Sequence, residues 1–136
     1  MPLRLEIVTP EAKTFSEDVE QVVLPGVEGE FGVLPGHEVL FTQIMPGELI
    51  ISQQRSTLYL AVGEGFVEVG PDRVSVLTDM AIKADDINEA EVEAARKRAE
   101  EAFLADKLSA EETTVVQAAL QKSLVQLNVK RRRRSS

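Results

Sequence analysis

Glycine and proline stop abruptly about halfway along this chain. All eight glycines and all six prolines of its 136 residues lie at or before Pro71, and alanine and glutamate dominate after Asp85. Glycine and proline punctuate short strands and turns, whereas a long stretch without either is compatible with helices. The sequence therefore predicts two domains: an N-terminal β domain, residues 1–84, and a C-terminal helical domain with a basic end, residues 85–136.

The first domain reads as a series of short strands. Leu3, Leu5 and Ile7 alternate with charged residues, which is the pattern of a strand with one buried face. Further apolar runs of strand length, each bounded by turn residues, cover residues 19–24, 48–52, 57–62, 66–69 and 74–77. Many short strands with regular turns predict an antiparallel β-sandwich or flattened barrel.

In the second domain apolar residues recur at helical spacing. Asn88 with Glu91, and Ser109 with Glu112, have the spacing of helix-capping boxes. The apolar stripes that follow them are Val92, Ala95, Ala99 and Phe103, and then Val116, Leu120, Leu124 and Leu127. The short link at 106–109 predicts an antiparallel two-helix hairpin. Because its first stripe is mostly alanine, the hairpin should dock on the β domain or on a partner, and could exchange between them.

Composition and pattern argue against several kinds of site. The chain has no cysteine and a single histidine, which rules out disulfides, thiolate metal sites and most histidine-rich metal sites. No P-loop, nucleophile elbow or zinc-protease helix occurs. No apolar run approaches the about 20 residues of a membrane span, and the N-terminus lacks a secretory signal pattern. We therefore expect no catalytic residue and no metal site.

Charge is distributed unevenly. The net charge is −8, yet residues 122–136 carry no acidic side chain and these basic ones: Lys122, Lys130, Arg131, Arg132, Arg133 and Arg134. We expect Lys130 and Arg131–Arg134 to have no counter-charge nearby and the basic end to favour an acidic partner, through an attraction that weakens with salt. The alternative is a solvated, disordered tail that orders on contact. The acidic body and the lack of aromatic residues beside the basic run disfavour nucleic-acid binding.

A compact turn lies within Gly29–Leu40. Proline fixes φ at the first corner of a tight turn and glycine accepts a positive φ at the second, so Pro35-Gly36 suits such a turn. The apolar residues just before it, up to Leu34, are expected to reach back into a core. His37 and Glu38 are then presented just past the turn. The stretch is either a rigid binding loop or an ordinary connection between strands.

Three segments in order resemble the epsilon subunit of rotary F-type ATP synthases. They are Gly29–His37 (GEFGVLPGH), Ile44–Gly47 (IMPG) and Gly65–Val69 (GFVEV). With the order of the two domains, the resemblance spans nearly the whole chain. The sequence departs from the family at Val39, where proline is frequent, and at Glu64, where a second glycine is usual. Both departures concern turns.

The resemblance implies a non-catalytic subunit of the central stalk of a proton-translocating ATP synthase. Similar proteins bind the gamma subunit through the sandwich, sit on the ring of c subunits, and couple proton flow to ATP synthesis by rotating with the stalk. The implied location is peripheral, on the cytoplasmic face of the bacterial plasma (inner) membrane. The implied contacts to the c-ring and gamma are Glu30, Phe31, His37 and Glu38. Alternatively, His37 merely closes its own turn.

The resemblance also implies a mobile hairpin. In this family it either lies on the sandwich or extends along the stalk, where it inhibits ATP hydrolysis and contacts an acidic segment of the catalytic beta subunit. Lys122, Lys130 and Arg131–Arg134 are the implied beta contacts. The rival functions are a protein-interaction module unrelated to ATP synthase and nucleic-acid binding through the arginine-rich end.

Nucleotide binding is the family property that fits this sequence least. Some members bind ATP through an I/L-D-x-x-R-A motif at the start of the first helix. Here Asn88 replaces the aspartate, Glu91 the arginine and Val92 the alanine. A carboxylate repels a phosphate, so we expect no tight ATP binding and no other cofactor. Arg96 and Arg98 either compensate from later turns or form a solvated helix face.

Overall fold

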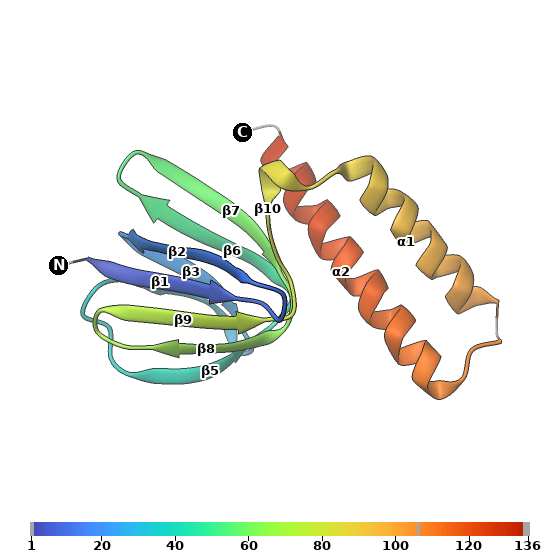
Figure 1. The fold of residues 1–136 in the computed structure, drawn as a ribbon, viewed down its shortest axis with the longest axis horizontal. Helices are drawn as coiled ribbons and strands as arrows, with labels where there is room; N and C mark the ends of the chain where they lie inside the picture. Colours follow the sequence, from blue (N-terminus) through green and yellow to red (C-terminus); the bar gives the residue numbers. More distant parts are fainter. Residues whose placement is uncertain (1, 106, 135–136) are drawn as a thin grey trace.

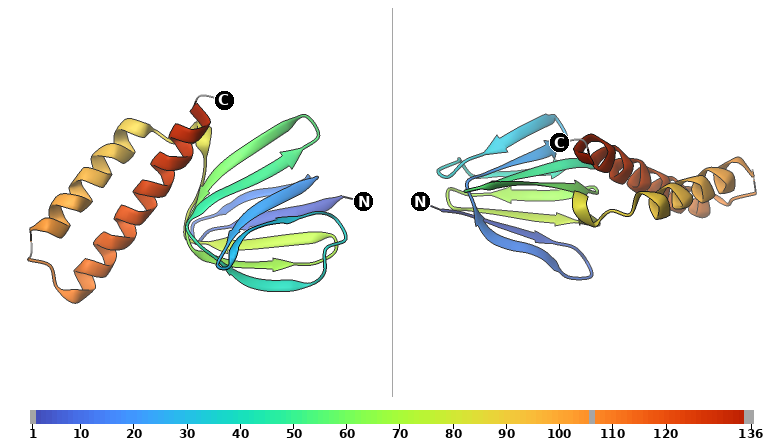
Figure 2. Two further views of the ribbon diagram at one scale, coloured as in Figure 1. Left: turned by 180° about the vertical axis from the view of Figure 1, so that it is seen from behind. Right: turned by 90° about the horizontal axis from the view of Figure 1, so that it is seen from above.

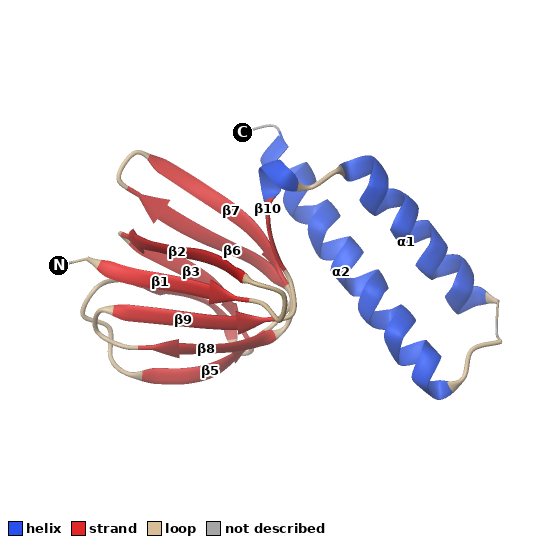
Figure 3. Ribbon diagram, viewed as in Figure 1, coloured by secondary structure: helices blue, strands red, loops and turns tan. Residues whose placement is uncertain are grey.

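A curled β-sheet and a helical hairpin lie side by side in the computed structural model (Figure 1), which describes residues 2–105 and 107–134 and leaves the side chains of residues 13, 14 and 134 undescribed. Ten strands come first and two long helices follow, α1 (Glu89–Leu104) and α2 (Ala110–Arg134) (Figure 3). The strands lie within residues 3–83. Independent folding of the β domain up to residue 84 stays a prediction.

The ten strands form one continuous sheet. They are β1 (Leu3–Val8), β2 (Lys13–Val19), β3 (Gln21–Gly26), β4 (Gly29–Val33), β5 (Leu40–Ile44), β6 (Gly47–Gln53), β7 (Ser56–Val62), β8 (Gly65–Val69), β9 (Arg73–Thr78) and β10 (Ala81–Lys83). Their order is β10-β7-β6-β3-β5-β8-β9-β1-β2, and β4 pairs with β3 beside this path. The predicted antiparallel sandwich or flattened barrel is confirmed as one curled sheet, except that β1 and β9 run parallel.

The inner face of the curled sheet encloses an aliphatic core. Leu3, Leu5 and Ile7 are fully buried, as their alternation predicts. They are joined by buried residues from the other strands, among them Val22, Leu24, Val33, Ile44, Leu49, Ile51, Leu60, Val67 and Val76. Burying one such side chain contributes about 1.5–3 kcal/mol. This core is the main source of stability in the β domain.

The Gly29–Leu40 stretch is only partly a loop. Its first five residues form β4, paired with β3. Gly36 adopts φ +88°, as the Pro-Gly pair predicts, and its N–H donates to the carbonyl oxygen of Pro71 at 2.6 Å. Leu34 is 57% exposed, so the expectation that it reaches the core is wrong. The strand ends at the buried Val33, and the residue after it turns outward.

Both helices begin where the capping patterns predict. The side chain of Asn88 accepts the N–H of Glu91 at 3.1 Å. Ser109 accepts the N–H of Glu112 at 3.1 Å, and the carboxylate of Glu112 accepts the N–H of Ser109 at 3.3 Å. Each cap contributes about 1 kcal/mol. The two-helix hairpin is therefore confirmed, down to the residues at which its helices begin.

The hairpin docks on the sheet by one end. Helix α2 lies between the sheet and α1, and the far half of the hairpin projects away from the sheet (Figures 1 and 2). A second apolar cluster joins the C-terminal part of α2 to β7, β10 and the short helix η1 (Ala84–Asp86): Ala61, Met80, Ala84, Ile87 and Val129. Away from this cluster Phe103 and Leu124 remain 43% and 42% exposed. The hairpin is held by far fewer apolar contacts than the β domain.

We expect Gly65→Ala to destabilise the β domain. A Cβ at this position would overlap the carbonyl oxygen of Leu77 on the paired strand β9. Forcing in the extra atom costs about 2 kcal/mol, which lowers the melting temperature by about 6 °C. Thermal melting followed by circular dichroism tests this. Gly70→Ala is the control, because its nearest neighbour would lie 3.7 Å away; equal melting temperatures of the two variants would contradict the packing argument.

Candidate interaction surfaces

The residues implied as contacts to the c-ring and gamma lie around the β4 strand and the turn after it. Glu30 and Glu38 are exposed, and His37 is half-buried. Phe31 is partly buried and packs against the core. A Cβ atom at Gly26 would lie only 2.8 Å from carbons of the Phe31 ring, so glycine at that position makes room for the ring. Glu30 is therefore presented at the start of a well-anchored strand, and Glu38 just past the turn that follows the strand's other end.

His37 closes its own turn. Its Nδ1 lies 2.7 Å from the carbonyl oxygen of Glu38. A carbonyl oxygen can only accept, so Nδ1 carries the proton and donates it to this bond. The other ring nitrogen, Nε2, is not used in the bond. His37 therefore has the structural role of closing its turn, and this role leaves the Nε2 atom for contact with a partner.

An exposed apolar surface lies on the outer face of β5, β8 and β9. We call Phe41, Phe66 and Leu77 the outer apolar patch; they are 65%, 47% and 54% exposed. The two phenylalanine rings stack with centroids 5.7 Å apart, and Phe66 pairs with Leu77 across the strands. Large apolar side chains gathered at a surface often mark an interaction site.

The sequence reasoning missed this patch, although a signal for it exists. Val67 and Val69 are buried in β8, and strand alternation then turns Phe66 to the opposite face. A shallow pocket of about 380 Å³ continues the patch toward the turn after β1, and Pro10 and Asp79 are among its lining residues. The patch and the pocket form one apolar surface with a polar edge.

The basic end of the chain is folded back onto the acidic body. Glu48 on β6 accepts two hydrogen bonds from Arg133, Nε to Oε2 at 2.9 Å and Nη2 to Oε1 at 2.5 Å. Arg132 Nη1 also donates to Glu48, at 3.2 Å. The expectation that these cations have no counter-charge nearby is therefore wrong. Their partner is more than eighty residues away in sequence, where charge counting along the chain could not find it.

The other basic residues of this end are engaged as well. Arg131 donates to Glu89 at 2.9 Å and to Glu93 at 2.8 Å, which ties the end of α2 to the start of α1. Lys130 donates to the carbonyl oxygen of Ala84 at 3.1 Å, and Lys122 pairs with Asp79 at 3.2 Å. The side chain of Arg134 lies outside the described part of the chain. Its backbone closes α2, so this end is helical here rather than a disordered tail.

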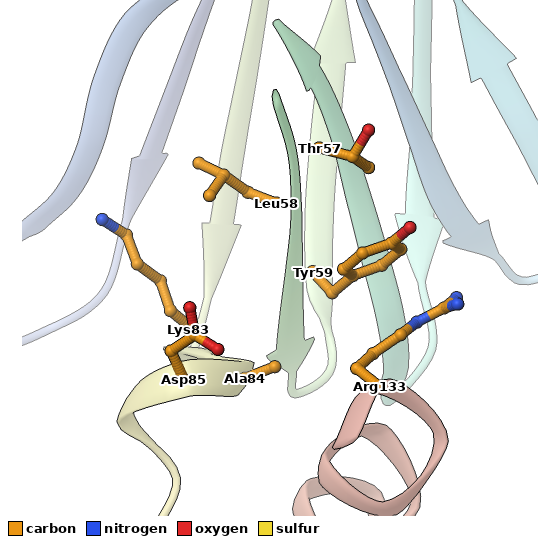
Figure 4. Close-up of a pocket in the computed structure, with 7 residues that line it drawn as sticks. All are labelled: Thr57, Leu58, Tyr59, Lys83, Ala84, Asp85 and Arg133. Atoms are coloured by element: carbon orange, nitrogen blue, oxygen red, sulfur yellow. The ribbon is translucent and has the colours of Figure 1, made fainter. Parts of the chain in front are cut away.

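Arg133 also contacts an aromatic ring. Its guanidinium carbon lies 3.8 Å from the centre of the Tyr59 ring, a cation–π contact. Figure 4 shows Arg133 reaching from the end of α2 beneath Tyr59, beside a pocket of about 370 Å³ that Lys83 and Asp85 also line. The hydrogen bond to Glu48 raises the pKa of Arg133 above its usual value. The guanidinium is thus held from two sides at the junction of helix and sheet.

The region that would correspond to the ATP-binding motif is occupied by internal contacts. The Asn88 side chain caps α1, and Arg96 bonds to Glu93 and Glu100 on its own helix. Hydrogen bonding from Arg96, and then from Arg131, holds the pKa of Glu93 below its usual value. Arg96, considered as a compensating phosphate ligand, is therefore already paired with carboxylates.

Two features are absent from the part of the chain that the structure describes. No group of three or more histidine, aspartate or glutamate side chains could hold a metal ion within residues 2–105 and 107–134. Over the same residues, neither helix is long and apolar enough to cross a membrane.

Residues 2–84, the whole set of strands, match the family model of the β-sandwich domain of the ATP synthase delta/epsilon chain. The chain belongs to this family. It is 43% identical to the ATP synthase epsilon chain of Herpetosiphon aurantiacus over 99% of this chain and 98% of that one. It is 51% identical to the epsilon chain of Pelotomaculum thermopropionicum over 72% of this chain and 73% of that one.

Solved structures share the fold at lower sequence identity. A chain of the Euglena gracilis mitochondrial ATP synthase, solved with OSCP, F1 and c-ring, superposes with a TM-score of 0.71 at 22% identity, over 88% of this chain and 76% of that chain. A chain of the Tetrahymena thermophila central stalk and c-ring gives 0.58 at 10% identity, over 96% and 97%. The predictions of family, fold class and a non-catalytic ATP synthase subunit are confirmed by the family match and the curated relatives.

Proposed function

We propose that this chain joins the gamma subunit to the c-ring in the rotor of a proton-translocating ATP synthase, at the cytoplasmic face of a bacterial inner membrane. The observation that carries the proposal is the outer apolar patch. Its three residues are between 47% and 65% exposed. Burial against another subunit removes that apolar area from water.

Two surfaces of the β domain suit two different partners. The outer apolar patch fits gamma, because permanent interfaces between subunits are more hydrophobic than transient ones. Glu30, exposed on β4, fits the polar loops of the c-ring, which commonly offer arginine in this family. A carboxylate and a guanidinium form a strong charge-assisted pair. Phe31 anchors the strand that carries Glu30, and His37 and Glu38 form the adjoining turn.

We expect Phe66→Ser with Leu77→Ser to weaken binding to purified gamma subunit. Loss of two central apolar contacts at an interface costs about 2 kcal/mol or more, which is about a thirtyfold loss of affinity. Binding is measured by calorimetry or surface plasmon resonance. Phe103→Ser, at an equally exposed position on the hairpin, is the matched control. If both variants bind gamma like the parent, the patch is not the gamma contact.

The hairpin is the proposed regulatory element. It is docked by one end only, and ionic contacts hold that end, so its release disturbs little of the β-domain core. Once released, Lys122, Lys130 and Arg131–Arg134 carry the charge that would meet an acidic segment of the catalytic beta subunit. Attraction between such opposed charges acts over about 8–10 Å at physiological salt. In this state the hairpin inhibits ATP hydrolysis.

We expect deletion of residues 130–136 to weaken inhibition while leaving binding to gamma unchanged. The truncated chain keeps the β domain but loses the cluster of cations. The hydrolysis rate of the reconstituted complex should rise at least about twofold, as expected for losing contacts of about 0.5 kcal/mol or more. Arg98→Gln, an exposed arginine on α1, is the control for a simple loss of charge. An unchanged hydrolysis rate in the truncated complex would contradict the inhibitory role.

We further propose that the chain binds no nucleotide tightly. Glu91 is placed where the family motif has arginine, and Arg96 is paired within α1. A phosphate group would have to displace these carboxylates or lie against them. Calorimetric titration of the isolated chain with ATP should show no binding with a dissociation constant below about 100 µM. A dissociation constant in the low micromolar range, which corresponds to a binding free energy of about −8 kcal/mol, would overturn this proposal.

A further inference from the structure

Glu48 occupies an unusual position for a carboxylate. Its side chain is only 7% exposed, on a sheet face that also carries the apolar cluster under α2. In the strand register Glu48 stands opposite Ala61, which is a member of that cluster. Leu49, the next residue, points to the opposite face and into the β-domain core. The end of α2 therefore docks directly over a carboxylate set at the edge of an apolar surface.

A carboxylate in this position has different partners in the two states of the hairpin. With α2 docked, Glu48 is shielded from water and needs a cation, because a buried unpaired charge is costly. Arg133 and Arg132 supply it. With α2 released, water solvates Glu48 and no cation is needed. The interaction therefore favours docking only while the arginines are in place.

We propose that Glu48, Arg132 and Arg133 form a clasp that sets how often the hairpin leaves the sheet. We call these three residues the Glu48 clasp. Tyr59 supports it, since its ring lies against the guanidinium of Arg133. Exposed ion pairs surround the docked end: Lys122 with Asp79, and Arg131 with Glu89 and Glu93. Exposed pairs contribute little, so the shielded carboxylate is the decisive member.

The clasp also governs the availability of the arginines. Arg133 bonds to Glu48 only while α2 is docked, and it meets the acidic partner surface only when the hairpin has left the sheet. Docking and inhibition therefore compete for the same side chains. Removing the bond between Glu48 and the arginines should increase inhibition. This last step depends on the proposed inhibitory function, whereas the clasp itself is a property of the isolated chain.

A single thiol can report undocking. The chain has no cysteine, and Val129 on α2 is 3% exposed within the cluster under the helix. In a Val129→Cys background, the rate of labelling by a thiol reagent is proportional to the undocked fraction when redocking is fast. We call this thiol the hairpin reporter. Val67→Cys, in the β-domain core, supplies a core reporter that detects opening of the β domain itself. Clasp variants are introduced into both backgrounds.

We expect Arg133→Gln to speed labelling of the hairpin reporter at least about tenfold, because it leaves a shielded carboxylate with one exposed partner. Glu48→Gln should have a smaller effect, since Arg133 is 23% exposed and can reach water. The double variant should label more slowly than Arg133→Gln alone, because Glu48 then no longer carries an uncompensated charge. About 1 M NaCl should speed labelling of the parent more than of the double variant.

The matched controls are Glu28→Gln and Arg98→Gln, which remove the same charges from exposed positions. Both should leave labelling of the hairpin reporter unchanged, and no variant should speed labelling of the core reporter. Equal labelling of the hairpin reporter in Arg133→Gln and Arg98→Gln would overturn the clasp. So would strictly additive effects of Glu48→Gln and Arg133→Gln, because coupled residues give non-additive effects.

A separate assay tests the link to inhibition. In the reconstituted ATP synthase, Glu48→Gln should lower the ATP hydrolysis rate. Arg132 and Arg133 then lose their partner on the sheet but are still present in the chain to bind the beta subunit. Faster labelling of the hairpin reporter with an unchanged hydrolysis rate would leave the clasp standing and overturn the inhibitory function. Unchanged labelling overturns the clasp whatever the hydrolysis rate.

Discussion

The aliphatic core inside the curled sheet is the interaction on which the rest of the structure depends. It is built from fully buried side chains such as Leu5, Leu24 and Leu60, contributed by strands far apart in sequence. The cluster that holds the hairpin is much smaller, and alanines make up part of it. Because burial scales with apolar area, the sheet is a stable body and the hairpin a weakly held attachment. Both proposed roles follow from this difference in stability: the sheet serves as the anchor and the hairpin as the regulatory element.

Ion pairs add to the stability of the docked hairpin, where little apolar surface is buried. The acidic side chains that meet the basic residues of α2 are Glu48, Asp79, Glu89 and Glu93. These contacts do not compete with the formation of the sheet, since every one of them involves α2. They can therefore open without loss of the β fold. Salt weakens them and an acidic partner can replace them, which is the behaviour expected of a regulatory contact.

Local patterns predicted much of this fold. The alternation in β1 and the capping pairs Asn88–Glu91 and Ser109–Glu112 depend on neighbours along the chain, and the structure confirms them. Strand β2 was missed because Ser16, Glu17 and Asp18 disfavour a strand; it pairs at one edge of the sheet, where polar residues are tolerated. Alternation within β8 indicates that Phe66 faces outward, but no local pattern shows that Phe41 and Leu77 gather beside it. The partners of the arginines likewise depend on segments that only folding brings together.

The measurement that most directly tests this account is amide hydrogen exchange of the isolated full-length chain, followed by mass spectrometry. Exchange reports the free energy of local and global opening segment by segment. The account predicts that α1 and α2 open at a lower free energy than β1, β6 and β7, and that about 1 M salt lowers protection of the helices while the strands keep theirs. If helices and strands exchange together with one free energy and one salt response, the chain is a single cooperative unit and the account of a stable body with a releasable hairpin is wrong.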